Sequence, residues 1–154
     1  MTVKRPPAQS SRSADRNLLP LLVGTWSTEG KLVGLPAHPR NTLVAVDRYE
    51  WVPGLELLAH YVAGHLGRTS VASFDVWARD RGRQSYASTS FDDNGVATTF
   101  QSRFRGGEWT IVGEKQRFRG SFSKDRLTIV GTWDQKASGV WKPWLTITLR
   151  KAGA

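Results

Sequence analysis

The feature that most constrains the fold is a succession of short runs rich in β-branched and aromatic residues, separated by turn residues. About nine such runs follow Gly24, at intervals typical of all-β proteins, and no long amphipathic helical pattern interrupts them. The clearest turn contains Asn94 and Gly95, because Asn-Gly readily adopts the positive φ values of a tight hairpin turn. The runs extend over 24–33, 41–51, 55–63, 68–78, 84–91, 96–104, 108–118, 127–133 and 141–149.

Side chains alternate along these runs, which predicts antiparallel pairing, because parallel strands buried on both faces have continuous apolar sequences. In the last run, Leu and Ile at positions 145, 147 and 149 share one face, whereas Trp144 and two threonines share the other. A face that mixes Trp with Thr indicates either a cavity of mixed polarity or a solvated outer face. We therefore predict an all-β fold, a closed antiparallel up-and-down barrel of about 8–10 strands with a short N-terminal helical turn.

The chain has 154 residues, the size of one domain. Residues 1–16 combine four basic residues with Pro, Ser, Ala and Gln, and their low apolar content predicts a disordered basic tail. Residues 17–154 then form the barrel domain, which opens with a helical turn at Leu18 and Leu19 that could plug an opening. The tail lacks the apolar segment of a secretory signal and no run of about 18 apolar residues occurs, so we expect a cytoplasmic protein that does not span a membrane.

Composition narrows the function classes. The chain contains seven Trp, six Phe and three Tyr, no Cys, and a formal net charge of +9. The absence of Cys excludes a disulfide scaffold, a cysteine nucleophile and a cysteine-ligated metal site. The motifs Gly-x-Ser-x-Gly, His-Glu-x-x-His and Gly-x-Gly-x-x-Gly do not occur either. Function is therefore expected in the barrel interior or on its basic surface.

Three segments carry a resemblance to a known group of barrels. Residues 21–30, LLVGTWSTEG, lead from the helical turn into the first strand and resemble the opening of the calycins, which include lipocalins and fatty-acid-binding proteins. Within this segment, Gly-Thr-Trp is followed by a Glu-Gly pair. This combination is most similar to the start of nitrobindin-type barrels and of a related bacterial lipocalin-like family. Residues 74–77, FDVW, and 141–150, WKPWLTITLR, resemble the middle and the end of that bacterial family. The similarity covers about residues 18–151.

The resemblance implies a closed barrel whose first and last strands pair. It also implies structural roles for two residues, because in calycins the Gly-x-Trp tryptophan commonly packs at the closed end under an Arg from a late strand. Here these residues would be Trp26 and Arg150. A guanidinium over an indole face contributes about 0.5–2 kcal/mol.

By analogy with this fold, we expect a small, largely apolar or aromatic ligand to bind in the barrel lumen, with a few polar groups fixing its orientation. Each predicted contact depends on strand register, because a slip of one residue turns a side chain outward. The sequence leaves open whether the barrel acts alone or as a homodimer. Alternation places the candidate ligand-binding residues at His60, Tyr86, Gln101, Glu114, Trp133 and Trp144.

Haem is the cofactor that the resemblance suggests, because nitrobindin-like barrels bind haem through a His near the C-terminal end. The three histidines of this chain are His38, His60 and His65, and none follows Arg68. His60 and His65 are five residues apart, so on one strand they face opposite sides and do not form a metal site. We therefore expect no metal and no cofactor; haem, with His60 as the one histidine placed to face the lumen, is a disfavoured alternative.

Two other functions stay open. A small barrel enzyme of the isomerase, cyclase or lyase type could act on a carbonyl or polyketide-like substrate, with Glu114 or His60 as the acid-base group. A basic nucleic-acid-binding barrel could use a stripe of arginines on two strands that we expect to pair across Gly106-Gly107. A solvated strand face explains this stripe more simply, so a nucleic-acid partner is not favoured. The stripe consists of Arg103, Arg105, Arg117 and Arg119.

Overall fold

A computed structural model describes residues 17–80 and 85–153, and the tail expected at 1–16 lies outside these residues. No helix in the described part of the chain is long and apolar enough to cross a membrane. The elements are α2 (Leu18–Leu22), β1 (Gly24–Leu32), the 3-10 helix η1 (Pro39–Asn41), β2 (Thr42–Trp51), β3 (Leu57–Leu66), β4 (Thr69–Asp80), β5 (Ser85–Asp92), β6 (Ala97–Arg105), β7 (Glu108–Val112), β8 (Gln116–Phe122), β9 (Thr128–Ala137) and β10 (Val140–Lys151).

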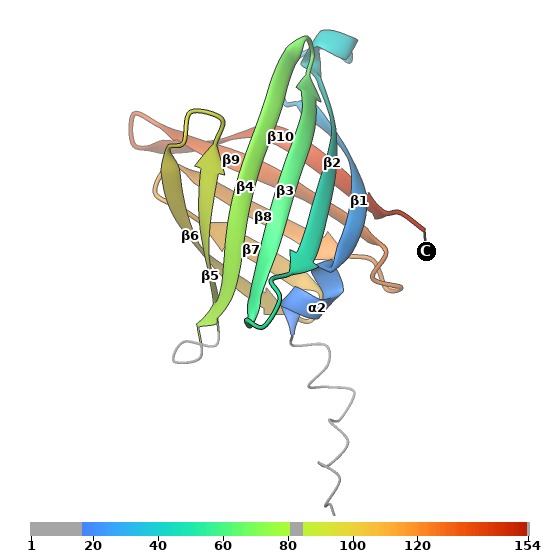
Figure 1. Ribbon diagram of the computed structural model, residues 1–154. Coiled ribbons are helices and arrows are strands. Elements are labelled where there is room, and N and C mark those ends of the chain that lie inside the picture. Colours follow the sequence, from blue (N-terminus) through green and yellow to red (C-terminus); the bar gives the residue numbers. More distant parts are fainter. Residues whose placement is uncertain (1–16, 81–84, 154) are drawn as a thin grey trace, which may run out of the picture.

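The ten strands form one closed antiparallel barrel in the order β1-β10-β9-β8-β7-β6-β5-β4-β3-β2 (Figure 1). Each strand pairs with its neighbours in sequence, and β1 also pairs with β10 from Trp26 opposite Lys151 to Leu32 opposite Leu145. Closure satisfies the backbone groups that an open sheet would leave at its edges. The predicted all-β barrel with paired first and last strands is confirmed.

One predicted run, 108–118, is two strands rather than one. β7 ends at Val112 and β8 begins at Gln116, because the chain reverses between them and the Gly113 N–H donates a hydrogen bond to the Gln116 carbonyl at 2.8 Å. This turn raises the number of strands to ten.

The same turn corrects the predicted arginine stripe. The Gly106-Gly107 turn joins β6 to β7, and β8 lies on the far side of β7. Arg103 on β6 therefore lies opposite Thr110 on β7, which in turn lies opposite Arg119 on β8. The two pairs of arginines are separated by a strand instead of facing each other directly.

The helix α2 covers the end of the barrel at which β1 begins (Figure 1). Leu18 and Leu22 are fully buried there. The Leu18 N–H donates to the Tyr86 hydroxyl at 2.9 Å, and Trp26 Nε1 donates to the Leu22 carbonyl at 2.8 Å. Two hydrogen bonds and two buried leucines thus fasten the helix to β5 and β1, and it closes this end of the barrel.

Trp26 is 0% exposed and lies edge-on against Phe122, with ring centroids 6.4 Å apart. The cation over its ring is Lys151, whose Nζ is 5.5 Å from the ring centroid, rather than the expected Arg150. In the register of β1 and β10, Trp26 is opposite Lys151 and Ser27 is opposite Arg150. Alternation therefore turns Arg150 to the exposed outer face.

We predict that Trp26→Ala lowers the free energy of unfolding by about 3–5 kcal/mol, because it removes a fully buried indole and its hydrogen bond to α2. Chemical denaturation of the purified protein measures this loss. Trp51→Ala is the control, since Trp51 is 43% exposed and its loss should cost about 1 kcal/mol or less. Equal losses in the two variants would contradict the role of Trp26 at the closed end.

Candidate functional site

A cavity of about 330 Å³ lies inside the barrel. The end of the barrel next to α2 is filled by a buried apolar cluster that includes Leu18, Trp26, Phe104 and Phe122. Beyond this cluster, the cavity wall is mainly aromatic and aliphatic, with a few hydroxyl groups and two carboxylates. This combination of volume, apolar lining and few polar groups is typical of a site for a small organic molecule.

The polar part of the wall is a hydrogen-bonded group of Asp47, His60 and Asp75, which we call the Asp–His–Asp cluster. His60 Nε2 is 2.7 Å from Asp47 Oδ2, and His60 Nδ1 is 2.7 Å from Asp75 Oδ2. Thr28 Oγ1 donates a further hydrogen bond of 2.5 Å to Asp47 Oδ1. All four side chains line the cavity.

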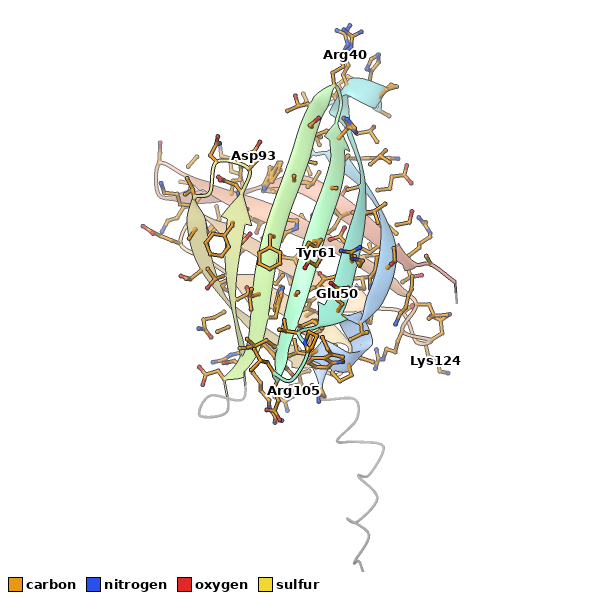
Figure 2. The ribbon with its side chains drawn as sticks, in the orientation of Figure 1. Arg40, Glu50, Tyr61, Asp93, Arg105 and Lys124 are labelled. Carbon is orange, nitrogen blue, oxygen red and sulfur yellow. The ribbon has the colours of Figure 1, made fainter. Side chains whose placement is uncertain are left out.

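Strand register brings the cluster together. His60 on β3 lies opposite Tyr49 on β2 and opposite Asp75 on β4. Asp47 is two residues before Tyr49 and shares its inward face. Tyr61, next to His60, lies on the outer surface (Figure 2), where Arg48 covers its ring at 4.6 Å. Three adjacent strands thus supply the cluster without a contribution from any loop.

His60 is charged at neutral pH. Burial alone lowers the pKa of His60, but the hydrogen bonds and negative charges of Asp47 and Asp75 outweigh this effect and raise it to about 9. An imidazolium has a donor on each ring nitrogen, which matches the two carboxylates that flank it. The Asp–His–Asp cluster is therefore a buried ion network.

Tyr49 supports the imidazole ring of His60 from one side. The two rings are stacked, with centroids 3.8 Å apart and planes 6° apart. Burial raises the pKa of Tyr49 well above its ordinary value, and the charges of Asp47 and Asp75 raise it further. Tyr49 is therefore a neutral phenol that holds the orientation of His60 by packing.

The carboxylates of the cluster differ in their hydrogen bonding. Both oxygens of Asp47 have partners, Thr28 and His60. Asp75 Oδ2 is bonded to His60, but the buried Asp75 Oδ1 has no hydrogen-bond partner among residues 17–80 and 85–153. A buried polar atom without a partner is costly and calls for an explanation.

Tryptophan and phenylalanine rings form much of the rest of the wall, and Trp77 lies on the same strand as Asp75. Trp77 and Trp109 have ring centroids 5.8 Å apart, and those of Phe118 and Trp133 are 5.3 Å apart. The Phe118 ring fits over Gly131, where an added Cβ would lie only 2.3 Å from Phe118 Cζ. The indole nitrogens of Trp77 and Trp109 are also buried without a partner in the described part of the chain, so a ligand acceptor could use them.

The structure places five of the six predicted ligand-binding residues in three settings. His60 and Trp133 line the cavity. Tyr86 is buried at the α2 end, where its hydroxyl accepts a hydrogen bond from Leu18. Gln101 on β6 is exposed, and Glu114 is exposed in the turn between β7 and β8.

Trp144, the sixth predicted contact, lies at a shift in register. Pro143 pairs with Asp134 and Leu145 pairs with Trp133, so Trp144 is an extra residue between them. Its side chain is half-buried. On β10 the residues that line the cavity are Leu145, Ile147 and Leu149, the apolar face, and not the face that mixes Trp with Thr.

Sequence reasoning missed Asp47 and Asp75. Both occupy inward positions of alternating runs, between Ala45 and Tyr49 on β2 and between Ser73 and Trp77 on β4. A lone acidic residue in an otherwise uncharged inward series was the signal that could have identified each of them.

The histidines and arginines named from the sequence lie mostly outside the cavity. His65 is exposed on the face of β3 opposite to that of His60. Arg117 Nε forms a salt bridge with Asp134 Oδ2 at 2.8 Å, and Arg117 Cζ lies 4.5 Å from the centroid of the Trp141 ring. In the described part of the chain, no group of three or more His, Cys, Asp or Glu side chains has the geometry to hold a metal ion.

Comparison with known proteins finds no family model that matches the chain and no curated protein that matches its sequence. The closed ten-stranded antiparallel barrel is compatible with a calycin-like fold.

The pKa of His60 predicts a pH dependence of stability. Because the folded-state pKa, about 9, exceeds the ordinary value of 6.5, folding takes up a proton between these values, and His60 contributes its full stabilisation only below pH 6.5. We expect the free energy of unfolding to fall by about 3 kcal/mol between pH 6.5 and 9. Denaturation at a series of pH values measures the slope.

His60→Gln is expected to remove this slope, because glutamine does not titrate. His65→Gln is the matched control on the same strand and should keep it, since His65 is exposed. A native slope that persists in His60→Gln would show that another group is responsible.

Proposed function

We propose that the protein binds a small, largely apolar ligand in the barrel lumen. The observation that carries this proposal is the cavity of about 330 Å³, whose wall combines aromatic side chains with a buried polar cluster. Apolar walls provide most of the binding free energy of a small molecule, and a few fixed polar groups select its orientation. The resemblance of residues 21–30 to nitrobindin-type and bacterial lipocalin-like barrels supports the same function.

The distribution of burial suggests how a ligand enters. Side chains close to α2 are fully buried, whereas cavity residues toward the other end of the strands, such as Leu43, Val62 and Gln116, are half-buried. Entry at the end remote from α2 is therefore part of the proposal.

The proposed ligand is not haem. His60 is the cavity histidine among the described residues, and carboxylates occupy both of its ring nitrogens. Iron ligation would need one of these hydrogen bonds to break.

We predict that the neutral fluorophore N-phenyl-1-naphthylamine binds in the lumen and accepts energy from the cavity tryptophans. Val62→Phe should weaken this binding by about tenfold or more, because the larger side chain occupies cavity volume. Fluorescence titration with excitation of Trp measures the dissociation constant.

Val46→Phe is the matched control, since Val46 is 50% exposed on the neighbouring strand. Equal binding by the two variants would place the fluorophore outside the lumen. Absence of binding to the native protein would count against the proposed function.

A second candidate, proton transfer on a bound carbonyl compound, is favoured by one observation: Asp75 Oδ1 has no partner among residues 17–80 and 85–153 and lies beside a protonated imidazole. Both ring nitrogens of His60 are hydrogen-bonded to carboxylates, and Glu114 is exposed to solvent. Neither residue is therefore placed to act as the general base. Asp75 Oδ1 would take the proton from the carbon next to the carbonyl, the electron pair of the C–H bond would move to the carbonyl oxygen to form an enolate, and the carboxyl group would then return a proton to the carbon.

If this second candidate is right, the protein will speed the exchange of the α-protons of 1-(2-naphthyl)propan-2-one for deuterium in D₂O, as followed by NMR. Asp75→Asn should reduce the exchange rate by about 100-fold. Asp93→Asn removes the same charge from an exposed hairpin and should leave the rate unchanged. A native rate equal to that of buffer would rule out this chemistry for the ketone.

A further inference from the structure

We propose that the ligand of the lumen is an organic cation, an apolar molecule whose protonated amine binds Asp75 beside Trp77. This inference rests on the proposed lumen binding and adds the chemical class of the ligand. Three observations carry it: the charge balance of the cavity, the hydrogen bonding of Asp75, and the tryptophan next to Asp75 on the inward face of β4.

The charge balance of the cavity is negative. The charged side chains on its wall are Asp47, Asp75 and His60, so two carboxylates face one imidazolium. Among the described residues, no Lys or Arg lines the cavity, although the chain carries a net charge of +9. A buried charge without a counter-charge is strongly unfavourable, and a ligand that brings one positive charge would neutralise the site.

The hydrogen bonds locate the missing positive group. Thr28 and His60 satisfy both oxygens of Asp47, so this carboxylate needs no further donor. Asp75 has one oxygen hydrogen-bonded to His60, but its second oxygen, Oδ1, is buried and has no hydrogen-bond partner among the residues that the structure describes. Because an ammonium group carries three donors and no acceptor, it matches a carboxylate oxygen that lacks a partner.

The aromatic surroundings favour a cation over a neutral donor. Trp77 follows Asp75 by two residues on β4 and shares its inward face, and the Trp109 ring lies 5.8 Å from the Trp77 ring. Indole faces attract cations, and the attraction is stronger when water is excluded. An alcohol would donate a hydrogen bond to Asp75 Oδ1 but would leave the negative charge unbalanced. A protonated amine would donate the hydrogen bond and also balance the charge.

The test compares three naphthalene compounds that differ in charge: 2-(1-naphthyl)ethylamine, 2-(1-naphthyl)ethanol and 1-naphthylacetate. Isothermal titration calorimetry of the native protein at pH 7 measures each dissociation constant. We expect the amine to bind about tenfold or more tightly than the alcohol, and the carboxylate to bind at least about tenfold more weakly than the alcohol.

Asp75→Asn locates the effect, because it removes the charge while keeping a similar shape. The ratio of amine to alcohol affinity should fall to about one in this variant. Asp93→Asn, which removes the same formal charge from the exposed hairpin at the far end of β5 (Figure 2), should keep the native ratio. If Asp75→Asn does not fold, nuclear Overhauser contacts between the amine methylenes and the Asp75 β-protons in the native protein replace it.

The outcomes separate the two levels of the proposal. Equal or tighter binding of the alcohol or the carboxylate would overturn the cationic ligand and leave lumen binding standing. A preference for the amine that persists in Asp75→Asn, or an absence of contacts to Asp75, would overturn the assigned residue. Binding of none of the three compounds would overturn the inference together with the proposed function.

Discussion

The pairing of β1 with β10 is the constraint on which the rest of the structure depends. It closes the sheet, so each strand has an inner and an outer face instead of two similar ones. Once the sheet is closed, the side-chain period of two determines which residues meet inside. Trp26, Thr28 and the Asp–His–Asp cluster owe their burial to this closure, because each would lie on an open face if the first and last strands separated.

Closure also explains why the candidate site can be rigid. Asp47, His60 and Asp75 come from the central parts of β2, β3 and β4, where every residue has a paired neighbour on the next strand. Backbone register fixes their spacing, and stacking by Tyr49 fixes the imidazole ring. A site on strands holds its geometry better than one on loops, so the proposed ligand binding needs no rearrangement of the cluster.

Local patterns predicted much of this arrangement, and non-local effects account for the rest. Strand alternation was sufficient to place His60 and Trp133 on the inner face. It failed at 108–118, because the turn at Gly113, Glu114 and Lys115 lacks an Asn-Gly or Pro signal and its Glu and Lys also suit an exposed strand. It failed at Trp144 because a register shift against β9 is a property of two paired strands, which the sequence of one strand does not reveal.

The charged cluster distinguishes the cavity wall from the apolar core at the α2 end. A buried ion network is weak evidence for stability, since well-packed apolar residues in its place are often neutral or stabilising. At the α2 end this chain fills its interior in that way, with Leu18, Trp26, Phe104 and Phe122. The same barrel keeps two carboxylates and an imidazolium where the apolar filling stops and the cavity begins. Because packing alone does not require charge at that depth, this contrast supports the proposed recognition of a molecule in the cavity.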